Sequence, residues 1–192
     1  MSDLFALAIG AVFVNNFIFV RFFGLCPFFG TSNNWENSMG MGAMVVFVMT
    51  CSSILSWLVN NFVLIPLNAE YLQLIVFIFI IAVFVQLMEM IIRKYSPPLY
   101  KSLGIFLPLM VVNCAIFAAT LDNAINNYTF SESLVNGFFS GIGFWLAMLL
   151  MAAVRERFEL IKVPESLRGI PIAIIVAAGA SLAFKAFSGF SL

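Results

Sequence analysis

Long apolar stretches are the feature that most constrains this chain. A helix needs roughly 20 residues to cross the hydrocarbon core of a bilayer, and stretches of about this length recur along the whole sequence. We predict six transmembrane helices, over residues 4–29, 39–59, 72–92, 103–121, 134–154 and 170–187. The connections between them are short. The sequence therefore predicts one all-α integral membrane domain over residues 1–192 with no extramembrane domain.

The composition agrees with lipid as the main solvent. Of the 192 residues 63% are hydrophobic and only 9% are charged, whereas soluble proteins are about 25% charged. A soluble protein this apolar could not cover its surface with polar groups. The net charge is zero and His is absent. These facts argue against nucleic-acid binding, which needs a basic surface, and they remove the commonest catalytic base and metal ligand.

The charges of the predicted loops indicate the orientation of the chain, because Lys and Arg are enriched in cytoplasmic loops. The third and fifth loops carry Arg93, Lys94, Lys101, Arg155, Arg157, Lys162 and Arg168. On the opposite side the basic residue is Lys185, near the C-terminal end. Both termini are therefore predicted to face outward, away from the cytoplasm.

A faint internal similarity suggests two inverted halves. The sequence MGMG at 39–42 opens the second predicted helix, and SGIG at 140–143 lies early in the fifth. A second pair of similar segments, 96–105 and 163–170, falls out of phase with this repeat. Tandem three-helix halves must lie in opposite orientations across the membrane, and such repeats build midplane sites from broken helices. We predict repeats over about 1–95 and 96–192, with the first and fourth helices broken.

Two cysteines lie near predicted breaks in these two helices. Cys26 stands between Gly24 and Pro27, and proline disfavours helix at the residue before it, so a break or kink is predicted beside this thiol. Pro108 and Cys114 share the fourth helix. Irregular backbone at membrane depth is tolerated only where protein buries it. Breaks in corresponding helices of two inverted halves would bring Cys26 and Cys114 face to face.

The pattern leaves two interpretations of these cysteines open. Free Cys is often a small buried hydrophobe, and Pro and Gly are frequent in membrane helices. Alternatively, the two thiols are half of a metal site. A [2Fe–2S] cluster needs four ligands, usually Cys, so a second chain would have to supply the other two. Cys51 has no adjacent Pro or Gly and is interpreted as a packing residue.

Ionisable and amide groups in apolar spans are costly and usually functional. Arg21, Glu89 and the pair Asn15–Asn16 are of this kind. Glu89 stands four residues before Arg93, so a local ion pair is an alternative to an ion-handling role. The sequence has no P-loop, no dinucleotide-binding glycine motif and no Cys-x-x-Cys. The chain is not expected to bind NAD or ATP by itself, so any redox chemistry must be shared with other chains.

The sequence contains the motifs VNNF at 14–17, GLCPF at 24–28, MGMG at 39–42, LGIFLPL at 103–109, NCA at 113–115 and FSG at 187–189. In these motifs the chain resembles the A-type subunits of Rnf electron transport complexes. The resemblance covers essentially the whole chain. The related E-type subunit of the Na⁺-translocating NADH:quinone oxidoreductase is similar, but it has a Glu-Asn pair and a Cys-Thr step where this chain has Asn15–Asn16 and Cys26–Pro27.

The resemblance implies a subunit of a redox-driven ion translocase, a ferredoxin:NAD⁺ oxidoreductase that couples electron flow to Na⁺ or H⁺ translocation. It implies an intramembrane [2Fe–2S] cluster shared with the homologous E-type subunit, with Cys26 and Cys114 as the ligands from this chain. Flavin-bearing and cluster-rich subunits would be further partners, beside membrane lipid. The location would be the bacterial inner (cytoplasmic) membrane, with both termini periplasmic. A subunit of the Na⁺-translocating quinone reductase, a small secondary transporter and a structural scaffold remain the alternatives.

Overall fold

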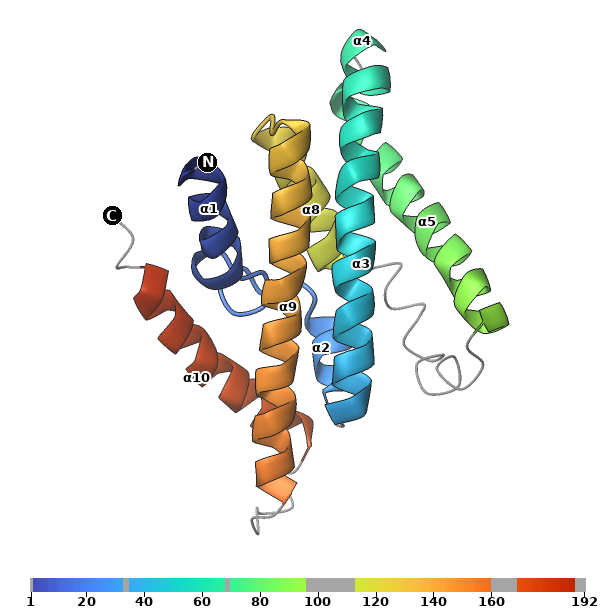
Figure 1. Ribbon diagram of the computed structural model, residues 1–192. Coiled ribbons are helices and arrows are strands. Elements are labelled where there is room, and N and C mark those ends of the chain that lie inside the picture. Colours follow the sequence, from blue (N-terminus) through green and yellow to red (C-terminus); the bar gives the residue numbers. More distant parts are fainter. Residues whose placement is uncertain (1, 33–34, 68–69, 96–112, 160–168, 189–192) are drawn as a thin grey trace.

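The computed structural model describes residues 2–32, 35–67, 70–95, 113–159 and 169–188, and all regular structure within these ranges is helical (Figure 1). The α-helices are α1 (Ser2–Ile9), α2 (Leu25–Thr31), α3 (Trp35–Val59), α4 (Ile65–Leu67), α5 (Gln73–Tyr95), α8 (Cys114–Ile125), α9 (Phe130–Glu159) and α10 (Ile170–Ser188). The shorter elements are the π-helices η1 (Gly10–Val14) and η2 (Asn60–Leu64) and the 3₁₀ turn η3 (Glu70–Leu72). The predicted all-α class is confirmed.

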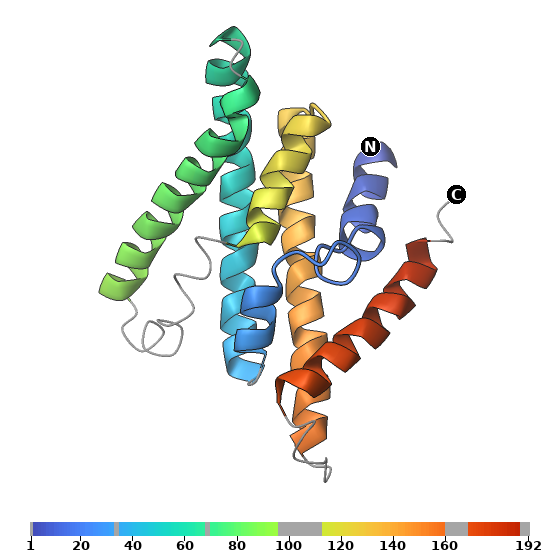
Figure 2. The same ribbon diagram turned by 180° about the vertical axis from the view of Figure 1, so that it is seen from behind.

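Helices α3 and α9 form the centre of the molecule and run side by side in opposite directions (Figures 1 and 2). Glycines let their backbones approach closely, as is usual between membrane helices. A Cβ added at Gly42 would lie 1.9 Å from Cδ1 of Trp145, and one at Gly141 would lie 2.8 Å from Cα of Val46. The two glycine motifs that suggest an internal repeat therefore belong to the central helix pair.

The buried apolar residues gather around this pair, between the first span, α3, α8 and α9. The largest of them include Phe28, Phe144, Met41, Met49 and Met148. By contrast, α5 and α10 flank the centre and turn large apolar side chains outward. These exposed side chains include Ile75, Phe79, Ile174 and Leu182. An apolar outer surface of this kind is what lipid contact requires.

Three helices of the described part are long and apolar enough to cross a membrane: Trp35–Leu64, Gln73–Ile91 and Phe130–Phe158. The shorter apolar helices are Leu4–Val14, Cys114–Ile125 and Ile170–Ala186. These positions follow the predicted spans, but residues 103–112 of the fourth span lie outside the described residues. The count of six spans and the inverted repeat therefore stay predictions.

The ends of the helices segregate by charge. The N-terminus, the connection from α3 to α5 and that from α8 to α9 lie toward one end of the molecule, whereas α3 begins and α5 and α9 finish toward the other (Figures 1 and 2). Arg93 and Lys94 lie in the last turn of α5, and Arg157 in the last turn of α9. These three basic residues thus share one end, as the loop charges indicate, whereas Lys185 lies in the last turn of α10, which runs toward the other end (Figure 1). Which end faces the cytoplasm stays a prediction.

The placement of Arg155 in a loop after residue 154 is wrong, because α9 continues to Glu159. Nη1 of Arg155 donates to the carbonyl oxygen of Phe29 at 3.0 Å and to Oγ of Ser32 at 2.8 Å. The last carbonyls of a helix have no intrahelical donor, so Arg155 satisfies one at the end of α2. A helical conformation at residue 155 is what delivers the guanidinium there.

Candidate functional site

The first span is interrupted over residues 15–24, between η1 and α2. Asn16 is fully buried and supports the interruption. Its Oδ1 accepts from the backbone N–H groups of Ile18 (3.0 Å) and Phe19 (3.3 Å), and its Nδ2 donates to the carbonyl oxygens of Val12 (3.1 Å) and Gly143 (2.9 Å). Buried backbone groups need partners. One side chain therefore supplies hydrogen-bond partners to a buried segment that is not helical.

Other contacts hold the same segment. Oγ of Ser181, on α10, donates to the carbonyl oxygen of Phe19 at 2.6 Å. The backbone N–H of Phe23 donates to the carbonyl oxygen of Phe17 at 2.7 Å. Phe22 and Gly24 both have left-handed backbone conformations, at φ 59° and 76°. A bulky residue in this region is strained and persists only where its surroundings hold it.

Cys26 lies in the first turn of α2, directly after this interruption. The prediction of a break near Cys26 is confirmed, and so is the part expected of Gly24 in it, but the part assigned to Pro27 is wrong. Pro27 sits in the first turn of α2, where a missing N–H costs no helical hydrogen bond. The helix begins after Gly24, whose left-handed conformation ends the irregular segment.

Cys114 is the first residue of α8. Its neighbour Asn113 is the N-cap, and Oδ1 of Asn113 accepts from the N–H of Ala115 at 3.0 Å. Asn is among the preferred residues at this position. Pro108 and the preceding turn lie outside the described residues, so a break of the fourth helix stays a prediction. The described part shows a helix that starts at Cys114.

The starts of α2 and α8 lie against each other. A Cβ added at Gly24 would lie 3.0 Å from Oδ1 of Asn113, 3.1 Å from Cβ of Ala115 and 2.6 Å from Cε2 of Phe144. From this contact α2 and α8 extend toward opposite ends of the molecule (Figure 2). Cys26 and Cys114 thus each lie within two residues of one shared contact.

Both thiols are exposed at the surface of this chain and unpaired. Packing inside the chain therefore explains neither of them, whereas Cys51 is half-buried within α3. Among the described residues, the buried amide nitrogen Nδ2 of Asn113 has no hydrogen-bond partner. Beside it, the first N–H groups of a helix favour negative charge. The arrangement combines two outward thiols with a buried donor and two helix N-termini.

Two thiols are an incomplete ligand set for a metal centre. Within the ranges that the structure covers, no group of three or more His, Cys, Asp or Glu residues could hold a metal ion. The residues present therefore do not make a closed site within the described chain. They are compatible with half of a site at a surface between chains.

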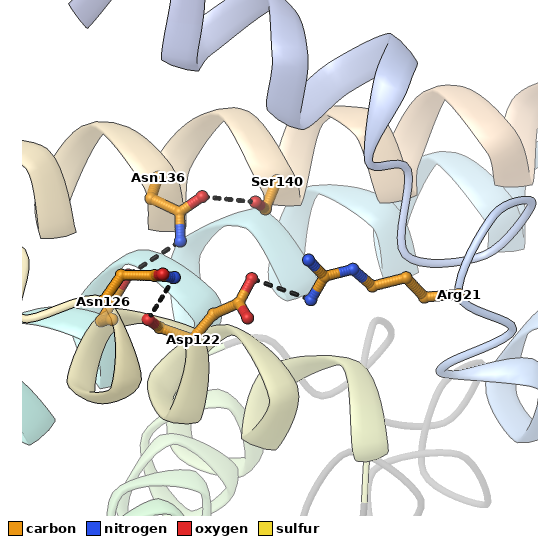
Figure 3. Close-up of polar contacts among 6 residues, drawn as sticks. Arg21, Asp122, Asn126, Asn136 and Ser140 are labelled. Carbon is orange, nitrogen blue, oxygen red and sulfur yellow. Dashed lines mark hydrogen bonds and ion pairs between the residues drawn. The ribbon is translucent and has the colours of Figure 1, made fainter. Parts of the chain in front are cut away.

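A second polar cluster joins the irregular segment to α8 and α9 (Figure 3). Nη1 of Arg21 lies 2.9 Å from Oδ2 of Asp122, and the guanidinium stands 5.5 Å from the ring centroid of Phe17. On α9, Nδ2 of Asn136 donates to Oδ1 of Asn123 at 2.7 Å. Sequence reasoning identifies Arg21 but misses Asp122. The one signal for it is that a cation in an apolar span needs a counter-charge.

The chain matches the family described as "Rnf-Nqr subunit, membrane protein" over residues 4–191. It is 50% identical over 189 residues to the A-type subunit of the ion-translocating oxidoreductase complex of Sodalis glossinidius, and this alignment covers 98% of each chain. The same protein of Edwardsiella ictaluri is 49% identical and that of Escherichia fergusonii 50% identical, again over 98% of each chain. Together with the apolar helices, these matches identify a multi-pass membrane protein.

Proposed function

Because the chain belongs to the Rnf-Nqr family of membrane subunits, we propose that it is one component of an ion-translocating oxidoreductase complex and carries electrons through a shared [2Fe–2S] cluster. The observation that carries this proposal is the contact between the starts of α2 and α8. It places an exposed thiol, Cys26 or Cys114, in the first turn of each helix. A homologous E-type subunit would supply the other two cysteines.

The residues at this contact fit such a cluster chemically. A [2Fe–2S] centre is held by four thiolates, and the bound group is an anion. The N-terminus of α8 favours negative charge, and Nδ2 of Asn113 is a buried donor without a partner among the described residues. Hydrogen bonds to cluster sulfurs and solvent exposure set the reduction potential. When bound, the cluster would supply a one-electron carrier between ferredoxin-facing and flavin-bearing subunits.

The residues of this chain would position the cluster and keep water away from it. Asn16 holds the irregular segment, and Phe28 and Phe144 are buried beside it. A charge added in a low-dielectric region is expensive unless a counter-charge moves with it. This cost is the physical basis that we propose for coupling the ferredoxin:NAD⁺ reaction to Na⁺ or H⁺ translocation.

The experiment compares the purified complex carrying Cys26→Ser or Cys114→Ser with a Cys51→Ser control. We expect either ligand variant to lose one [2Fe–2S] signal in electron paramagnetic resonance, with two irons fewer per complex. The Cys51→Ser complex should retain both the signal and the two irons. An assembled Cys114→Ser complex with wild-type iron content and wild-type NAD⁺ reduction by ferredoxin would overturn the proposal.

The same measurement separates the alternatives. A secondary transporter or a scaffold would contain no iron that depends on Cys26 or Cys114. A component of the Na⁺-translocating quinone reductase would copurify with quinone reductase activity. The relatives described above are named as A-type subunits of ion-translocating oxidoreductase complexes, which favours the Rnf assignment.

A further inference from the structure

A polar cavity of about 390 Å³ lies among the first span, α8 and α9, beside the interruption. Its polar lining includes Arg21, Asp122, Asn126, Tyr128, Asn136 and Ser140, and its remaining wall comes mainly from small apolar residues of α1 and η1. We propose that this cavity binds a small monovalent cation at Asp122, and that the guanidinium of Arg21 occupies the cation position in this structure. The role in ion transport rests on the proposed function; the binding site itself does not.

The oxygen atoms around Asp122 suit such an ion. Small hard cations prefer carboxylate, carbonyl, amide and hydroxyl oxygens. Oδ1 of Asn136 accepts from Oγ of Ser140 at 3.3 Å, so an amide oxygen and a hydroxyl oxygen lie next to each other on the α9 side of the cavity (Figure 3). Burial raises the pKa of the Tyr128 phenol, and Asp122 and Glu132 raise it further. The phenol is therefore neutral at physiological pH and adds no competing charge.

The ion pair between Arg21 and Asp122 is weak enough for a cation to replace the guanidinium at the carboxylate. Within the described part of the chain, the carboxylate of Asp122 accepts one hydrogen bond, from Nη1 of Arg21 to Oδ2. The side chains are 34% and 26% exposed, and a single-contact, partly exposed ion pair contributes little to stability. The ring of Phe17 also offers Arg21 a cation–π contact. This contact can stabilise the guanidinium after it has left the carboxylate.

The location of the pair connects it to the proposed electron carrier. Arg21, on the irregular segment, precedes Cys26 of α2 by five residues, and Asp122 follows Cys114 by eight residues on α8. Next to Arg21, Phe22 has the strained φ of 59°. A displacement of this segment would move both a thiol and the guanidinium. Asp122 would then be free to bind a cation when the segment shifts.

The test titrates NaCl against choline chloride, at constant ionic strength, on the purified complex. Hydrogen–deuterium exchange is followed in peptides that cover residues 15–24 and α8. We expect a Na⁺-dependent change in exchange in the wild type. Arg21→Gln should lower the Na⁺ midpoint about tenfold or more, because one competing positive charge is removed. Asp122→Asn should abolish the response.

Glu36→Gln is the control, because Glu36 lies in the first turn of α3, at the opposite end of the molecule, and does not line this cavity. Its Na⁺ midpoint should equal that of the wild type. A wild type that does not respond to Na⁺, an Asp122→Asn variant that keeps the wild-type midpoint, or an Arg21→Gln variant with an unchanged or higher midpoint would each overturn the proposal. The iron signal of the same samples reports separately on the proposed cluster.

Discussion

Arg21 and Asp122 meet at 2.9 Å although 101 residues separate them. Arg21 belongs to the segment that interrupts the first span, and Asp122 to the helix that begins at Cys114. One ion pair therefore joins the segment that leads into α2, the helix of Cys26, to α8, the helix of Cys114. Beside it, Gly24 packs against Asn113 and Ala115. The starts of α2 and α8 thus pack against each other, and the segment before α2 is also held to a later turn of α8 by an ion pair.

Replacement of Asn16 should destabilise the protein strongly. Asn16→Leu removes the partners of the N–H groups of Ile18 and Phe19 and of the carbonyl oxygen of Gly143. Each buried group left unpaired costs about 1–3 kcal/mol. We expect loss of the assembled complex, or a large drop in its midpoint of thermal unfolding. The more exposed neighbour Asn15 is the control, and Asn15→Leu should change this midpoint little. Equal effects of the two changes would contradict the role of Asn16.

Gly24→Ala should separate the starts of α2 and α8. The added Cβ would meet Cε2 of Phe144 at 2.6 Å, and such overpacking costs about 1–3 kcal/mol. The φ of 76° adds about 1–2 kcal/mol for any L-residue. We expect a weakened or shifted [2Fe–2S] signal and a lower unfolding midpoint.

The matched control for this change is Gly169→Ala. Gly169 also has a positive φ, 99°, but no described residue has an atom within 4 Å of the added Cβ. It therefore reports the backbone penalty alone. If the two variants lowered the unfolding midpoint equally and both kept the signal, the close contact at Gly24 would have no role in the site.

The sequence predicts helices better than it predicts how the first one is interrupted. Pro27 acts on its own backbone, so its effect can be inferred locally, and it draws attention to the correct region. Asn16 supports the interruption through Gly143, which is 127 residues away, and the segment is held by Ser181, 162 residues from its acceptor Phe19. Contacts over such separations depend on the packing of whole helices. Periodicity and local propensity do not contain them.

The candidate site, too, combines features that the local sequence predicts with features that depend on the packing of distant helices. Cys26 and Cys114 stand out in the sequence because Pro and Gly residues accompany them, a local pattern. Their exposure at the surface of the chain and the unpaired donor of Asn113 follow from how α2 and α8 meet. By its position in the sequence Asp122 belongs to a loop, whereas it lies in the last turns of α8 and faces Arg21. A charge near the end of a helix can be assigned to the loop or to the core only once its partner is known.

Asn113 is expected to tune the potential of the proposed cluster. Asn113→Ser keeps an oxygen that can cap α8 but removes the unpaired amide donor. A hydrogen bond worth about 1 kcal/mol corresponds to about 40 mV for one electron, so the midpoint potential should fall by about that amount. Asn123→Ser, which removes another unpaired amide near the far end of α8, should leave the potential unchanged. A potential that does not move in Asn113→Ser would show that its amide does not contact the cluster.

Arg155 is expected to hold the end of α2. Arg155→Gln removes the donor to the carbonyl oxygen of Phe29 and to Oγ of Ser32, and hydrogen bonds from charged groups contribute about 1.5–3 kcal/mol each. We expect faster hydrogen exchange over residues 25–32 in the complex. Arg157→Gln removes the same charge at an exposed position, so any effect of charge alone on topology is shared by both variants. Equal exchange in both would contradict the capping role.

The orientation of the chain can be tested at the two ends of the helix bundle. The basic end holds Arg93, Lys94 and Arg157, and cytoplasmic loops are enriched in such residues. Ser2→Cys, at the opposite end, should react with a membrane-impermeant maleimide added to intact spheroplasts. Arg157→Cys should react only after the membrane is permeabilised. Labelling of the protein without these substitutions measures the reaction of Cys26, Cys51 and Cys114, and this background is subtracted.

The same labelling tests the number of spans. Because Ser2 begins α1 and Arg157 lies near the end of α9, five crossings separate them if the predicted six spans are correct. Opposite accessibility therefore tests an odd number of crossings as well as the outward N-terminus. Labelling of both sites in intact spheroplasts would refute the orientation and the span count together.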